Sequence, residues 1–299
     1  MIDERRRGTY FGTAAYLMWG LFPLYWPLLE PAVPIEILAH RVVWSLVVCA
    51  ALLVVVPAAR AVFSLGWRRL RLLAVAACAL ALNWGVFIYG VNSHQVVETS
   101  LGYFINPIVT VSLAVLVLGE TLRARQWVAV GVASLAVIVL TVDYGRPPLI
   151  AITLAFTFAG YGLMKKKAGV GAIESLAVET AVLFLPALGV LAVIAARGQA
   201  HVEGVSHGLL LAGAGAVTAL PLLAFGAAAR RVPLTTLGLL QYLAPTLQFL
   251  IGVVVRGEPM PAVRLVGFGL VWIALALFTG EALSHRRRQL RLTTEASAA

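Results

Sequence analysis

The chain has 299 residues, of which 61% are hydrophobic and 12% are charged. Soluble globular domains contain about 45–50% apolar and about 25% charged residues, so this composition excludes an ordinary soluble protein. The formal net charge is +10. The basic residues nevertheless form short clusters between hydrophobic stretches, which is typical of membrane orientation and excludes a nucleic-acid partner.

Ten apolar stretches follow one another along the chain, each about as long as a helix that crosses a bilayer. The first follows Arg5, Arg6 and Arg7, but it is longer than the apolar part of a signal peptide and lacks a clear cleavage site. We therefore interpret it as an uncleaved helix. The predicted transmembrane helices are residues 8–28, 34–56, 70–91, 98–118, 126–143, 148–165, 172–195, 207–229, 235–255 and 263–283. The sixth is short for a membrane-spanning helix.

The distribution of Lys and Arg predicts the orientation of these helices. With the N-terminus in the cytoplasm, eighteen of the 23 basic residues fall in cytoplasmic segments and four in outer ones. Both termini are then cytoplasmic: residues 1–7, and a basic tail over 284–299 that we expect to be solvated and disordered. The localisation implied is the cytoplasmic (inner) membrane.

The two halves of the chain repeat each other. Four spaced residues recur at a common offset of 138 positions: Pro107, Gly119, Glu120 and Gly131 correspond to Pro245, Gly257, Glu258 and Gly269. The repeat units are residues 8–143 and 148–283. Each holds five helices, so the second unit enters the membrane from the opposite side. Inverted repeats of this kind are common in secondary transporters, which bind substrate near the midplane between the halves.

The sequence at these positions resembles the RarD branch of the EamA-type drug/metabolite transporter (DMT) superfamily over about residues 8 to 285. The matching stretches are Trp19-Gly20, His40-Arg41-Val42, Trp44-Ser45, Asn83-Trp84, residues 100–107 with Gly119-Glu120, and Thr236-Leu237-Gly238 with Gln241-Tyr242 and Pro245-Thr246. The resemblance implies an all-α fold of ten helices, with a central cavity lined mainly by helices 1–4 and 6–9. It also implies export or exchange of small organic molecules.

Prolines interrupt matching helices of the two halves. Pro107 and Pro245 are expected near the middle of helices 4 and 9, and Pro221 interrupts helix 8. A proline within a helix frees the carbonyl four residues earlier, here those of Tyr103 and Gln241. Lipid cannot satisfy these groups, so they must face protein or a wet cavity. Asn106 and Tyr242 stand beside them. Kinks that serve packing alone are the alternative interpretation.

Arg41 is an arginine about 10 Å inside the second helix. A charge at that depth costs at least about 2.5 kcal/mol, so the side chain must point inward or snorkel. We expect it to pair with Glu98 or with Glu179, its equivalent in the repeat. It would then bind an anionic substrate group or form a gate, or merely fix helix packing. Glu98 and Glu179 are also candidates to carry a coupling proton.

Two further sets of residues have assigned roles. Trp84 and Tyr103, with Tyr242, lie deep enough to stack on a flat substrate, although ordinary packing is the alternative; Trp26, Trp67 and Tyr144 lie near helix ends and suit interfacial belts. Glu120 and Glu258 each follow a glycine and are expected to cap the next helix.

The sequence thus predicts a secondary-active or facilitative transporter, and neither an enzyme, a cofactor nor a metal site is expected, because no HExxH, GxSxG or P-loop motif is present. The expected partners are a small amphipathic substrate and membrane lipid. A GxxxG motif at Gly8–Gly12 would pack two helices or a homodimer. A flippase and a non-transporting scaffold or sensor are the alternatives. The residues predicted to line the path are Arg41, Asn83, Trp84, Tyr103, Asn106, Gln241 and Tyr242.

Overall fold

The computed structural model describes residues 2–118, 124–229, 231–232 and 240–298, and within them its regular secondary structure is helical. The helices of the first half are α1 (Ile2–Gly20), α2 (Phe22–Tyr25), α3 (Pro34–Val55), α4 (Trp67–Asn92), α5 (Val96–Leu118) and α6 (Ala124–Tyr144). Those of the second half are α7 (Leu149–Ala168), α8 (Ala172–Ala196), α9 (Gly204–Ala229), α11 (Leu243–Leu250) and α12 (Ala262–Ala298).

Six of these helices are long and apolar enough to cross a membrane: α3, α4, α6, α8, α9 and α12. Two shorter apolar stretches, Leu149–Lys165 and Leu243–Val255, lie in the second half. Nine of the ten predicted segments coincide with a described helix or part of one, and the ninth lies partly outside the described residues. Because so many long apolar helices follow one another, the chain is a multi-pass membrane protein.

Two helices differ from the sequence-based expectation. α12 does not give way to a disordered tail after residue 283 but continues to Ala298, since the tail contains no proline or glycine to end it. The ninth predicted helix is interrupted: residues 241–242 form a turn, α11 starts at Leu243, and a π-helical turn (Ile251–Val255) follows. Pro245 therefore lies in the first turn of a short helix and not in the middle of a long one, because a proline is tolerated there without loss of a helical hydrogen bond.

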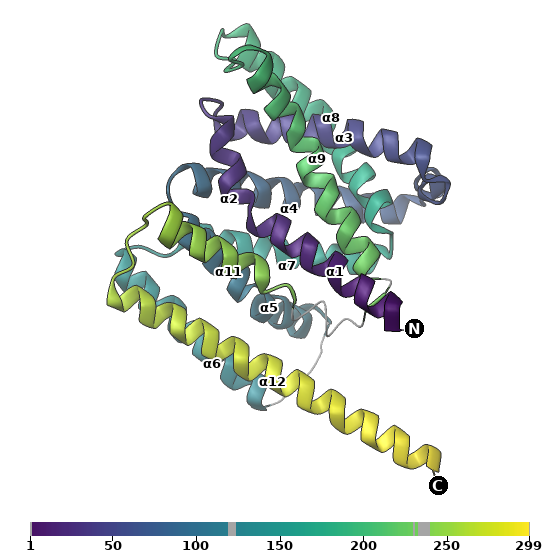
Figure 1. Cartoon of the computed structure of the whole chain (residues 1–299), viewed down its shortest axis with the longest axis vertical. Coiled ribbons are helices and arrows are strands. Elements are labelled where there is room, and N and C mark those ends of the chain that lie inside the picture. Colours follow the sequence, from purple (N-terminus) through teal and green to yellow (C-terminus); the bar gives the residue numbers. More distant parts are fainter. Residues whose placement is uncertain (1, 119–123, 230, 233–239, 299) are drawn as a thin grey trace.

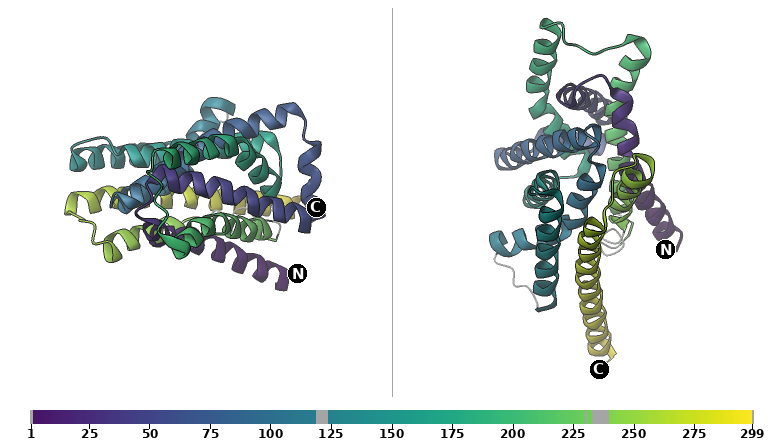
Figure 2. Two further views of the ribbon diagram at one scale, coloured as in Figure 1. Left: turned by 90° about the horizontal axis from the view of Figure 1, so that it is seen from above. Right: turned by 90° about the vertical axis from the view of Figure 1, so that its left-hand side faces the viewer.

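The helices form a bundle, and different helices lie at its two opposite sides (Figure 1). α8 and α9 pack on α3 at one side, and α6 packs along α12 at the other. Between them, α7 contacts both α4 and α5, while α1 contacts both α9 and α11. The C-terminal part of α12 projects beyond the bundle (Figure 2).

Glycines allow the closest helix contacts. A Cβ atom on Gly102 of α5 would meet the backbone of Ala151 in α7, and one on Gly215 of α9 would meet the backbone of Trp44 in α3. Small residues at such crossings are typical of helix packing in membranes. Gly8, in the predicted GxxxG motif, packs in the same way against Arg231 and Val232 of its own chain.

Candidate functional site

A cavity of about 410 Å³ lies inside the bundle. α1, α3, α4 and α5 line it from the first half of the chain, and α7, α8, α9 and the start of α11 line it from the second half. Six of the residues predicted from sequence to line a transport path line this cavity: Arg41, Asn83, Trp84, Tyr103, Asn106 and Gln241. Tyr242 instead packs against the apolar cluster formed by α5, α6 and α12.

Arg41 is the most unusual group in the cavity wall. Its side chain lies between α3 and α9 and is 3% exposed. Nε donates a hydrogen bond to the Thr218 hydroxyl at 2.9 Å. The guanidinium carbon lies 3.8 Å from the centre of the Trp84 ring, 4.9 Å from that of Trp26 and 5.6 Å from that of Phe22. Aromatic faces attract a cation within about 6 Å, so these rings stabilise the charge, and no carboxylate of the described residues forms an ion pair with it.

The expected ion pair of Arg41 with Glu98 or Glu179 is wrong. Glu98 accepts from Arg146 Nη2 at 2.9 Å and from the Ile150 backbone N–H at 3.0 Å. Glu179 lies 3.7 Å from Lys165 instead. Aromatic rings stabilise the charge of Arg41 in place of a carboxylate. The position of Arg41 in the sequence does not reveal which rings surround it.

Lys165, Tyr161 and Glu179 form a second polar group, in which Tyr161 and Lys165 line the cavity. The Lys165 ammonium donates to the Tyr161 hydroxyl at 2.7 Å, and that hydroxyl donates to Glu179 at 3.2 Å. Glu179 is completely buried behind them on α8. A cation and an anion thus offset each other at this wall of the cavity.

Two asparagines tie the helices around the cavity together. The Asn83 amide of α4 donates to the Leu154 carbonyl and the Thr157 hydroxyl of α7, each at 3.0 Å, and its oxygen accepts from the Tyr103 hydroxyl at 3.1 Å. The Asn106 amide of α5 donates to the Ala155 carbonyl of α7 at 3.1 Å. Because both amide nitrogens are used in this way, the two asparagines shape the wall, and Asn83 also positions Tyr103.

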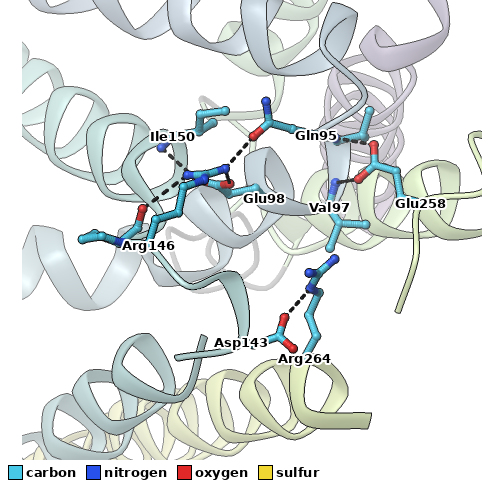
Figure 3. Close-up of polar contacts among 10 residues, drawn as sticks. Gln95, Val97, Glu98, Asp143, Arg146, Ile150, Glu258 and Arg264 are labelled. Carbon is cyan, nitrogen blue, oxygen red and sulfur yellow. Dashed lines mark hydrogen bonds and ion pairs between the residues drawn. The ribbon is translucent and has the colours of Figure 1, made fainter. Parts of the chain in front are cut away.

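Beyond the cavity, a polar network joins the two halves at the end of the bundle where α5, α7 and α12 begin (Figure 3). Arg146 bridges Glu98 and Gln95, donating at 2.9 and 2.7 Å. Arg264 of α12 donates to Asp143 of α6 at 2.8 Å. The network connects segments that are far apart in sequence at this end of the bundle.

Glu258 completes this network as a helix cap. Its carboxylate accepts from the backbone N–H groups of Val96 and Val97, at 2.5 and 2.8 Å. Gly257 has φ +64°, in the left-handed region that favours glycine, and allows the turn that directs Glu258 toward α5. The sequence predicted a cap on the next helix; the capped helix is α5 of the other half. Glu120, its counterpart, lies outside the described residues.

Sequence reasoning missed several residues of the cavity. Thr218 and Phe158 gave no signal. Gln248, which lines the cavity and donates to the Trp19 carbonyl at 3.1 Å, is detectable in hindsight because its repeat equivalent, Thr110, is also polar. Trp26 was expected in an interfacial belt, but it is fully buried beneath Arg41, since the chain turns inward after α1.

The fold and the cavity are those of an all-helical membrane transporter, and the comparisons agree. A family model described as the EamA-like transporter family matches residues 6–142. Protein RarD of Streptomyces exfoliatus is 54% identical over 99% of this chain and 95% of its own. The uncharacterized transporter YojE of Bacillus subtilis is 40% identical over 95% and 97%. The chain belongs to the RarD branch of the EamA-type drug/metabolite transporter superfamily.

One solved crystal structure is similar in fold. It is 19% identical in sequence, covers 90% of this chain and 96% of its own, and superposes with a TM-score of 0.56. This likeness concerns the fold alone.

Proposed function

We propose that this transporter moves a small amphipathic organic molecule across the cytoplasmic membrane by alternating access, as a secondary-active or facilitative exporter or exchanger. The observation that carries the proposal is the cavity, which both halves of the chain line with a mostly apolar wall and a few polar groups. Ligand sites commonly have this composition and lie between the halves of a transporter.

The helix contacts support two five-helix inverted repeats, which would make ten membrane spans. If the halves are equivalent, α1 corresponds to α7, α3 to α8, α4 to α9, α5 to α11 and α6 to α12. Under this correspondence, a contact between two helices should recur between their counterparts. The α1–α9 contact recurs as α7–α4, and the α5–α7 contact recurs as α11–α1. The α3–α8 and α6–α12 pairs are each their own counterpart. The family model ends at residue 142, close to the boundary between the proposed units.

The direction of the helices follows from the basic residues. With both termini in the cytoplasm, the network of Glu98 and Arg146 lies on the outer side. We take it to be an outer gate that closes the path in this conformation and opens when the halves move. Glu98 acts in this proposal through Arg146, and not as a partner of Arg41.

A reversible cross-link tests the gate. The purified chain with Cys49→Ala and Cys78→Ala would receive Glu98→Cys and Arg146→Cys and be reconstituted in liposomes. Counterflow of radiolabelled amino acids, nucleosides and aromatic drugs would first identify a transported compound. A bifunctional thiol reagent should then stop its transport, and a reductant should restore it, while each single cysteine variant should be unaffected by bridging. Transport that continues through a quantitative cross-link would contradict alternating access at this gate.

The same liposomes address the energy source. Equal uptake with and without a pH gradient would exclude proton coupling through Glu98 or Glu179 and leave facilitated transport or exchange. Uptake that follows the gradient and is lost in Glu179→Gln would assign the coupling to that carboxylate.

A further inference from the structure

The charges of the cavity wall do not cancel. Among the described residues that line it, Arg41 and Lys165 are the charged ones, and both are cations. Lys165 is offset by Glu179 at 3.7 Å. None of the ion pairs between described residues includes Arg41. The wall of the cavity therefore carries one uncompensated positive charge.

Arg41 lines the cavity, and the hydrogen-bonding capacity of its buried guanidinium is not fully used. Its one hydrogen bond to a described residue is made by Nε to Thr218, and Nη1 has no partner among the described residues. The rings of Trp84, Trp26 and Phe22 stabilise the charge through their faces, an interaction that occupies no N–H group. Buried donors without partners are costly, and a bound anion is one way in which such a donor is satisfied.

The rest of the cavity suits a flat apolar body. Aromatic residues from several helices line it: Tyr16, Trp19, Phe22, Trp84, Phe87, Tyr103, Phe158, Tyr161 and Phe225. Tyr103 meets Phe158 edge to face, with ring centres 5.9 Å apart. The volume of about 410 Å³ is that of a pocket for a small organic molecule.

Resting on the proposed function, we infer that the substrate is an organic monoanion whose carboxylate is bound by Arg41 and whose flat apolar body lies against the aromatic wall. Arginine presents a planar fork of donors that matches a carboxylate in a bidentate arrangement. A single net charge suits a monoanion better than a dianion, which would remain partly uncompensated. A cation would meet an unpaired arginine and is excluded.

Three naphthalene compounds of similar size isolate the charge: 1-naphthaleneacetate, the neutral 1-naphthaleneacetamide and the cationic 2-(1-naphthyl)ethylamine. Binding to the purified full chain in detergent would be measured by calorimetry. Naphthaleneacetate should bind at least about tenfold more tightly than the acetamide, as expected of a charge-assisted pair that water does not screen, and the amine should bind most weakly. Equal or tighter binding of the amide or amine, or no binding of the acetate, would overturn the inference.

Variants then assign the preference to one residue. Arg41→Met should weaken acetate binding at least about tenfold and leave amide binding within about twofold, and Arg41→Lys should retain part of the preference. The amide also reports that the cavity is intact. Arg197→Met, which removes an exposed arginine outside the cavity, is the matched control. An undiminished preference in Arg41→Met would refute the assignment.

The two proposals fail separately. Transport of the amide or amine in preference to the acetate would refute the monoanion and leave alternating access intact. Selective binding of the acetate through Arg41, without transport of any compound in the counterflow panel, would keep the anion site and refute the transport role of the cavity.

Discussion

Replacing Glu258 by alanine should destabilise the protein, although the residue lies in a loop far from the cavity. Its carboxylate accepts two backbone N–H groups at the start of α5 and is 8% exposed. Loss of a helix cap costs about 0.5–2 kcal/mol. The second N–H group also loses its partner in a buried position, which costs about 1–3 kcal/mol. Together these give about 1.5–5 kcal/mol of lost stability.

The assay is unfolding in mixed micelles of dodecyl maltoside and SDS, followed by tryptophan fluorescence. Glu203→Ala is the control, because Glu203 is an exposed glutamate in another loop, and surface changes of this kind stay within about 0.5 kcal/mol. Glu258→Asp, which keeps the charge on a shorter side chain, should be intermediate. If Glu258→Ala unfolds like the control, the carboxylate does not cap α5, and the contact between the halves has another origin.

Three further changes follow from the same structure. Glu98→Ala should cost more stability than Arg146→Ala, roughly 2–4 against 0–1 kcal/mol, because Glu98 is buried and also accepts a backbone N–H group, whereas Arg146 is half exposed; equal losses in micelle unfolding would contradict this. Gly102→Ala should cost about 1–3 kcal/mol of stability by overpacking, while Gly131→Ala, in open space, should be neutral or stabilising. The yield of folded protein by size-exclusion chromatography measures this, and a lower yield for Gly131→Ala than for Gly102→Ala would contradict it. Thr218→Val removes the acceptor of the cavity arginine and should lower thermal stability by about 1.5–3 kcal/mol, the range for hydrogen bonds to charged groups; an unchanged melting profile would show that the aromatic rings alone hold the arginine.

The positions of the helices were predictable because hydrophobic length is a local property. A segment such as residues 34–56 must span a bilayer or be buried, and the helix found is Pro34–Val55. The break before α11 could not be predicted from hydrophobic length. The ninth stretch contains Gln241 and Pro245, and the proline predicts an interruption, but residue types alone do not say that the helix breaks into a turn at residues 241–242.

The repeat also carried information about contacts. It singled out Glu258 as half of a Gly-Glu pair, and the structure assigns that residue a cap. Sequence spacing could not say which helix receives the cap. The choice of α5 depends on how the halves interlock, and this involves residues separated by more than 150 positions.

By itself, the sequence determined that the chain is a multi-pass helical membrane protein, that it belongs to the RarD branch, and that Arg41 is too costly to be incidental. The membrane helices and the cost of Arg41 follow from residue types, because the bilayer excludes polar and charged groups. Membership of the RarD branch follows from matching sequence stretches. The tertiary structure decided how that cost is met: by the faces of Trp84 and Trp26 and by Thr218, and not by Glu98 or Glu179. A buried charge needs a favourable environment, but aromatic rings and carboxylates both supply one, and only the packing of distant helices selects between them.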